Sequence, residues 1–91
     1  MGPVPIVRLR PPLSDLAGGQ KEIQLDGTTV AEVLAALEQA HPPITGWILD
    51  EHGKIRRHVN VFVNKERGER ETAVGPDDRV QVLPAISGGQ S

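Results

Sequence analysis

One capped amphipathic helix is the feature that most restricts how this chain can fold. Thr29 and Glu32 match a capping box, in which the hydroxyl and the carboxylate each accept a hydrogen bond from a free backbone N–H of the first turn. Apolar residues then recur at helical spacing, at Val30, Val33, Leu34 and Leu37. Pro42 and Pro43 end the pattern. This spacing predicts one main helix with a single apolar stripe and makes Glu32 a cap rather than a catalytic acid.

Two strand patterns precede the helix. Residues 4–9 read as an opening strand, and residues 21–25 alternate polar and apolar side chains, as expected of a half-buried strand. Residues 10–20 contain two prolines and two glycines, which favours a loop. The two strands are therefore predicted to form a hairpin.

Two further strands are predicted after the helix. Residues 58–64 place three valines on one face, and residues 79–83 place Val80 and Val82 inward. A charged loop at residues 65–71 and a turn at residues 75–78 separate them. This order predicts an α+β fold, the β-grasp (ubiquitin-like) roll, with a mixed sheet of four to five strands and the helix across one face.

Composition excludes several classes of function. A chain of 91 residues makes one small domain with little room for a deep pocket, and its net charge of -2 lacks the basic excess of a nucleic-acid-binding protein. Cysteine is absent, which excludes disulfides and thiolate metal sites. No stretch has the length of a membrane span or the form of a signal peptide. We therefore expect a cytoplasmic protein that binds neither nucleic acid nor membrane.

The side chains give no pattern typical of a self-contained enzyme. His41, His52 and His58 fall on different predicted elements, so no metal site is expected. The serines lack a nucleophile elbow, and the paired acidic residues lie in turns. We expect no catalytic residue and no cofactor bound by the chain itself.

The dipeptide Gly88-Gly89 follows the last predicted strand, beyond Pro84. Two glycines make a slender thread that can enter a narrow channel and present a terminal carboxylate to another protein's active site. A frayed C-terminus explains the position equally well. The predicted organisation is a β-grasp domain over residues 1–84 and a flexible tail over residues 85–91.

Four blocks of sequence make the chain resemble the ThiS/MoaD family of ubiquitin-like sulfur carriers, and within it the CysO-type carriers of cysteine biosynthesis. They are Leu9-Arg10-Pro11, Gly18-Gly19-Gln20-Lys21, Val59-Asn60-Val61-Phe62-Val63-Asn64 and Val80-Gln81-Val82-Leu83-Pro84-Ala85-Ile86-Ser87-Gly88-Gly89. The last block is the most specific, because a hydrophobic strand, a proline, small residues and Gly-Gly occur in the family's order.

The resemblance implies a sulfur carrier that partner enzymes act upon. An E1-like (ThiF/MoeB-type) enzyme would use ATP to adenylate Gly89, and sulfur transfer would leave a glycyl thiocarboxylate. In the CysO-like branch the sulfur goes to an activated serine on a cysteine-synthase-like pyridoxal-phosphate enzyme. The tail residues that partners would recognise are Pro84, Ile86, Ser87 and Gly88. Because Gln90 and Ser91 follow Gly89, the resemblance implies a precursor cut between Gly89 and Gln90 by a JAMM-type metalloprotease.

A partner surface is predicted from strand parity. If the strand valines face the helix, then Phe62 and Leu83 share the opposite face, and an exposed apolar patch usually marks a partner site. The alternative is a second, minor core under residues 44–49, with Trp47 expected in a core. Arg56 and Arg57 form a small basic cluster suited to an acidic partner.

Three other functions remain open from the sequence. They are a binding module with no tail chemistry, the small subunit of a molybdopterin synthase, and a modifier that is conjugated to proteins through the same tail.

Overall fold

The computed structural model describes residues 4–84 of the chain. In chain order its elements are β1 (Ile6–Leu9), α1 (Leu13–Leu16), β2 (Glu22–Gln24), α2 (Val30–Ala40), the 3-10 turn η1 (Pro42–Ile44), β3 (Val59–Val63), β4 (Glu66–Arg67) and β5 (Arg79–Pro84).

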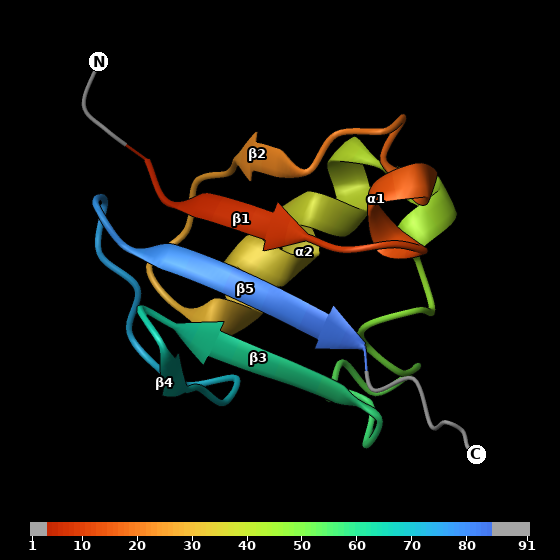
Figure 1. Cartoon of the computed structure of the whole chain (residues 1–91). Coiled ribbons are helices and arrows are strands. Elements are labelled where there is room, and N and C mark those ends of the chain that lie inside the picture. Colours follow the sequence, from red (N-terminus) through yellow and green to blue (C-terminus); the bar gives the residue numbers. More distant parts are fainter. Residues whose placement is uncertain (1–3, 85–91) are drawn as a thin grey trace.

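The strands form one mixed sheet in the order β2-β1-β5-β3-β4. Strands β1 and β2 make the predicted antiparallel hairpin, and Val7 pairs with Ile23. Strands β1 and β5 run parallel at the centre of the sheet (Figure 1), whereas β3 pairs with β5 in the antiparallel sense. The predicted mixed sheet of an α+β roll is therefore confirmed.

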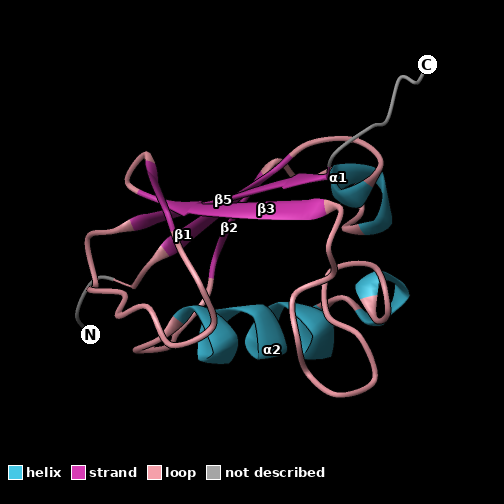
Figure 2. Cartoon of the chain, turned by 90° about the horizontal axis from the view of Figure 1, so that it is seen from below, coloured by secondary structure: helices cyan, strands magenta, loops and turns pink. Residues whose placement is uncertain are grey.

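Helix α2 lies across one face of this sheet, as Figure 2 shows from below. Its stripe of Val30, Val33, Leu34 and Leu37 is completely buried. The stripe packs in one hydrophobic core with the inward valines of β3 and β5, Val59, Val61, Val63, Val80 and Val82. The apolar side chains that recur every three to four residues on α2 thus pack against the valines that recur every second residue on the strands, as the sequence predicts.

The start of α2 is capped, but one bond differs from the prediction. Thr29 Oγ1 accepts a hydrogen bond from the Glu32 N–H at 3.2 Å, as expected. The Glu32 carboxylate instead accepts from the backbone N–H and the hydroxyl of Thr28, both at 2.8 Å. Carbonyls of the charged loop satisfy the next free donors, because Val30 N–H bonds to Thr72 O and Ala31 N–H to Arg70 O, both at 3.0 Å.

The predicted loop at residues 10–20 was wrong in part, because it contains α1. Two prolines precede this helix, a position where the missing proline N–H is harmless. Leu13 and Ala17 then enter the core with 1% and 0% exposure. Tertiary burial therefore makes a helix of a segment whose local composition favours a loop.

Trp47 is the second correction, because its side chain is 44% exposed instead of lying in a core. Ile44 and Ile48, on either side of it, are both fully buried and occupy the core positions of this segment. Gly46 adopts a left-handed φ of +90° directly before Trp47. The turn at Gly46 thus leaves the indole facing solvent.

The charged loop at residues 65–71 also contains more structure than predicted, since it includes β4. Asn64 and Lys65 have φ values of 52° and 78°, and Val63 pairs with Glu66 across them. Two consecutive positive φ values are typical of the tight type I′ hairpin. Asparagine adopts a positive φ more readily than most residues, so Asn64 is consistent with this turn. Lysine has no such preference, so Lys65 does not help to predict the turn from the sequence.

Candidate functional site

The predicted tail site lies outside the described residues. This applies to Ile86, Ser87, Gly88, Gly89 and Gln90, whose roles stay predictions. Pro84 is described, and it is the last residue of β5, paired with Val59 of β3. The boundary between a domain of residues 1–84 and a tail of residues 85–91 likewise stays a prediction.

Phe62 and Leu83 lie on the opposite side of their strands from the core valines, and therefore on the sheet face that α2 does not cover, which we call the open face. Both are half-buried, and they alternate with the buried valines of their strands. In the register Phe62 pairs with Gln81 and Asn60 with Leu83, which makes Phe62 and Leu83 diagonal neighbours. An Arg8–Glu22 ion pair at 3.2 Å lies on the same face.

The alternative of a second core beneath residues 44–49 was wrong. Ile44, Ile48 and Leu49 belong to the single core that also contains the stripe of α2. Phe62 and Leu83 are not part of that core. Within residues 4–84, Phe62 and Leu83 therefore keep part of their apolar surface exposed on the open face.

Arg56 and Arg57 belong to a different surface. They line a groove of about 530 Å³ whose floor includes Val59 and Val61, and these valines point to the opposite side of β3 from Phe62. Arg56 Nε donates a hydrogen bond to Gly46 O at 2.6 Å, while Arg57 is exposed. The four predicted partner residues thus divide into two pairs on two surfaces.

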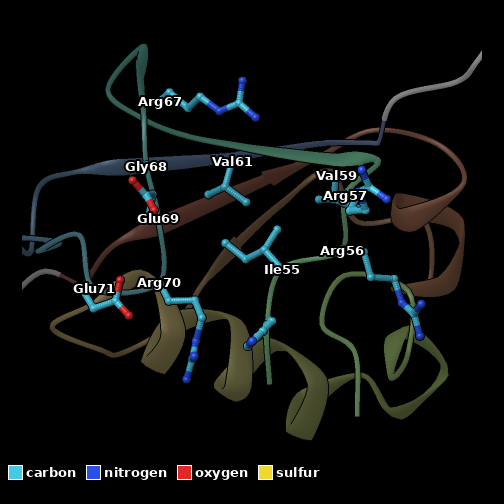
Figure 3. Close-up of a pocket in the computed structure, with 11 residues that line it drawn as sticks. Ile55, Arg56, Arg57, Val59, Val61, Arg67, Gly68, Glu69, Arg70 and Glu71 are labelled. Carbon is cyan, nitrogen blue, oxygen red and sulfur yellow. The ribbon is translucent and has the colours of Figure 1, made fainter. Parts of the chain in front are cut away.

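The groove also contains basic residues that sequence reasoning did not connect with Arg56 and Arg57. Lys54, Arg67 and Arg70 line it, together with Glu69 and Glu71. Figure 3 shows Glu69, Arg70 and Glu71 on the same side of the sheet as Val61 and Ile55, whereas the Arg67 side chain extends on the other side, as its pairing with Phe62 requires. The available signal was the density of charge in residues 65–71, but nothing in the sequence placed this loop opposite residues 54–57.

Three carboxylates outside the two surfaces are held by hydrogen bonds that favour their charged form. The backbone N–H of Thr28 and then its hydroxyl lower the pKa of Glu32. The Lys54 N–H is the main cause that lowers the pKa of Asp50, and the Gly75 N–H lowers the pKa of Asp78, followed by the Asn64 side-chain amide. Each carboxylate fixes a turn or a helix start, which is a structural role.

Within residues 4–84, no three histidine, aspartate or glutamate side chains gather where they could share a metal ion. Neither helix of that described part has the length and apolar character needed to cross a membrane.

The sheet with its first and last strands adjacent, and one long helix across it, defines a ubiquitin-like β-grasp protein. The model of the ThiS family matches residues 7–89. The chain therefore belongs to the ThiS family, which confirms the resemblance stated from the sequence.

Relatives of known identity agree with this membership. The chain is 37% identical over 78 residues to the sulfur carrier protein CysO of Mycobacterium tuberculosis, an alignment that covers 79% of this chain and 84% of that protein. It is 32% identical over 79 residues to small archaeal modifier protein 1 of Haloferax volcanii, covering 85% and 91%.

A crystal structure gives the same result. The Amycolatopsis orientalis BexX/CysO complex contains a chain that superposes with a TM-score of 0.86 at 32% identity. The superposition covers 94% of this chain and 100% of that one. The CysO-type likeness is thus present in both sequence and fold.

Proposed function

We propose that this protein carries sulfur as a thiocarboxylate on Gly89 and is a cosubstrate of partner enzymes, not itself an enzyme. The observation that carries the proposal is the ThiS family match, which runs from β1 through Gly89. The identity to a protein named as a sulfur carrier supports it. The chemistry depends on a backbone carboxyl group, so it needs no catalytic side chain in this chain.

The charging reaction has two steps. In the first, the Gly89 carboxylate attacks the α-phosphorus of ATP on an E1-like (ThiF/MoeB-type) enzyme, which forms an acyl adenylate and releases pyrophosphate. A carboxylate is a poor electrophile, and AMP supplies the leaving group that it lacks. In the second step a hydrosulfide attacks the acyl carbon, the C–O bond to AMP breaks, and a thiocarboxylate remains. Oxygen is replaced by sulfur with no change in redox state.

The activating enzyme has to approach the domain at one end of β5. Gly89 is the fifth residue after Pro84, so it can lie no more than about 18 Å from it. Phe62 and Leu83 lie on β3 and on β5 itself, within the open face. We therefore assign the open face to partner enzymes that receive the tail, with Pro84, Ile86, Ser87 and Gly88 as the tail residues that they recognise.

Charging requires that Gly89 carry a free carboxylate. In the sequence Gly89 is joined to Gln90 by a peptide bond, which leaves no acid group there to adenylate. A protease of the JAMM type would remove Gln90 and Ser91 by hydrolysis of the Gly89–Gln90 bond. Because adenylation uses ATP, we propose that the reaction takes place in the cytoplasm.

The test compares two forms of the protein with ATP, sulfide and a cognate E1-like enzyme. A form that ends at Gly89 is expected to gain the mass of one oxygen-to-sulfur exchange, while the form that retains Gln90 and Ser91 gains nothing. A third form, Gly89→Phe, controls for access to the enzyme's channel and is expected to remain uncharged. Charging of the Gly89→Phe form at the normal rate would refute the proposal.

The acceptor of the sulfur is proposed from the CysO-type likeness. A cysteine-synthase-like enzyme would supply an activated serine, and the thiocarboxylate sulfur would attack it. Incubation of the charged protein with such an enzyme and activated serine should first give an adduct in which the sulfur joins Gly89 to the serine β-carbon, with loss of the activating group. Hydrolysis of the acyl bond of this adduct should then release cysteine and restore the Gly89 carboxylate. If the protein is charged but this step fails, the sulfur goes to another acceptor, and a molybdopterin synthase is one candidate.

Conjugation to proteins is a second candidate function, because one relative is named as a modifier protein. The same adenylate would then react with a lysine amine of a target to form an isopeptide bond. Immunoblots of cells that express the form ending at Gly89 would show bands of higher mass if this occurs. A remnant of residues 80–89 on target lysines after trypsin digestion would identify it, because Arg79 is the last basic residue before Gly89.

A further inference from the structure

The charges of this protein are unevenly distributed. Five of its ten basic residues, Lys54, Arg56, Arg57, Arg67 and Arg70, line the groove beneath β3 and β4, together with two of its twelve acidic residues. The groove lining therefore has a formal charge of +3, and the remainder of the chain, with five basic and ten acidic residues, has -5. A protein with a net negative charge thus presents one concentrated cationic surface, which attracts acidic ligands.

Between residues 4 and 84, no carboxylate forms an ion pair with these cations, although the Asp50 carboxylate lies near enough to Arg56 for their charges to attract. Among residues 4–84, neither Glu69 nor Glu71 lies within 4.0 Å of a basic nitrogen, and the ion pair present in that range is Arg8–Glu22, on the open face. Arg70 Nε is buried and has no hydrogen-bond acceptor within the described part of the chain. A buried guanidinium N–H without an acceptor is costly, but this atom is covered by the protein itself and is out of reach of a ligand in the groove.

Both walls of the groove are fixed by hydrogen bonds in the free protein. The loop wall is tied to α2 through the Ala31 N–H to Arg70 O bond, and to β3 through the Gly68 N–H to Val61 O bond at 2.8 Å. The opposite wall is tied through Arg56 N–H to Ile48 O at 2.8 Å and through the Lys54 N–H to the Asp50 carboxylate at 2.9 Å. Fixed walls reduce the entropy lost when a ligand binds.

The lining indicates what kind of ligand fits. The half-buried Ile55 and the valines of β3 make an apolar floor between the two charged walls (Figure 3). Glu69 and Glu71 would repel closely spaced phosphates, but they can accept hydrogen bonds from peptide N–H groups. This combination suits a peptide that carries both carboxylates and apolar side chains better than it suits a nucleic acid.

We propose that this groove binds an acidic, extended segment of a partner protein. Carboxylates of the segment would pair with Lys54 and Arg57, and an apolar side chain would contact Ile55. The groove lies on the opposite side of β3 from Phe62, and the proposal does not depend on sulfur chemistry at Gly89.

The test uses the full chain and a fluorescein-labelled peptide that alternates glutamate and valine. In ¹⁵N-¹H spectra we expect the peptide to shift the amide signals of residues 54–57 and 67–71 most strongly. A peptide with glutamine in place of glutamate is expected to cause no shifts.

Charge reversal then tests the site itself by fluorescence anisotropy. The double variant Lys54→Glu/Arg57→Glu changes two exposed side chains of the groove and should weaken peptide binding about five- to tenfold. The control Arg10→Glu/Lys21→Glu makes the same change in net charge at exposed positions outside the groove and should weaken it less than about twofold.

Three results would overturn the proposal. They are an equal loss of affinity in both double variants, amide shifts confined to other surfaces, and pyrophosphate that shifts the groove amides while the acidic peptide does not. If the groove variant fails to fold, the map of amide shifts on the unaltered protein decides the question by itself.

Discussion

Gly27 allows us to test how tightly the start of α2 is packed. A Cβ atom at this position would lie 2.8 Å from Val33 Cγ2, 2.9 Å from the Val33 backbone nitrogen and 3.2 Å from the Glu32 carbonyl carbon. Two of these three atoms are backbone atoms of the first helical turn, and the Val33 N–H is bonded to Thr29 O at 3.0 Å. The helix cannot move away from the new methyl group without loss of its cap.

The expected magnitude for Gly27→Ala follows from two effects. The φ of Gly27 is +159°, a conformation that L side chains rarely adopt, and such strain amounts to about 1–3 kcal/mol. Overpacking against fixed atoms adds about 1–3 kcal/mol. We expect a loss of at least about 3 kcal/mol in the free energy of unfolding, which is a large part of the stability of a domain of this size.

Gly19→Ala is the matched control. Gly19 also has a positive φ, +85°, but a Cβ there would meet nothing within 4 Å. Its expected loss is therefore the conformational part alone, about 1–2 kcal/mol. Urea unfolding followed by far-ultraviolet circular dichroism measures both variants. If Gly27→Ala loses no more stability than Gly19→Ala, then the close approach of Gly27 to α2 does not restrict this position, and the reasoning fails.

Three further predictions address the cap, the core and the open face. The lowered pKa of Glu32 means that its charged form stabilises the fold above the ordinary pKa of 4.5, and that this stability is lost as the pH falls through the lower pKa of the folded state. Glu32→Gln should therefore lose less stability than the unaltered protein between about pH 6 and about pH 3 in urea titrations, and equal losses would contradict this. Trp47→Ala should lower the free energy of unfolding by less than about 1 kcal/mol, and Leu37→Ala by about 2–5 kcal/mol, so a reversed order would contradict the burial of these side chains. Phe62→Asp should lower kcat/KM for charging by the E1-like enzyme about tenfold, whereas Gln24→Asp, on the far edge strand β2 of the same face, should leave it unchanged; equal effects would mean that Phe62 is not a specific contact of the enzyme.

The helix and the strands were predictable because their side chains repeat with a period that leaves little choice. Leu34 and Leu37 on one layer and Val61 and Val82 on the other can be buried together in few ways. The short elements were not predictable in the same way. Helix α1 has four residues and β4 has two, so neither is long enough to show a period.

The groove could not be predicted because its walls come from separate segments. Arg57 and Arg67 are ten positions apart, and β3 runs between them before the turn at Asn64 and Lys65 brings β4 back. That turn depends on a positive φ at Lys65, and a lysine in a sequence does not predict a positive φ. The sequence shows how many charges there are, but the hairpin determines which of them share a surface.

The separation of two surfaces bears on how partners of such a protein are distinguished. Two glycines have no side chains, so a partner that received only Gly88 and Gly89 would gain little specificity from them. The folded domain must then supply the difference between one partner and another. Side chains alternate between the two sides of β3, and this gives the domain two chemically distinct surfaces. Phe62 points to the open face, while Val61 contributes to the floor of the cationic groove. Because the surfaces lie on opposite sides of β3, an enzyme that holds the tail against the open face leaves the groove free. An acidic segment, from that enzyme or from a second protein, can therefore bind while the tail is being charged, and the groove can change the affinity for a partner without altering the chemistry at Gly89.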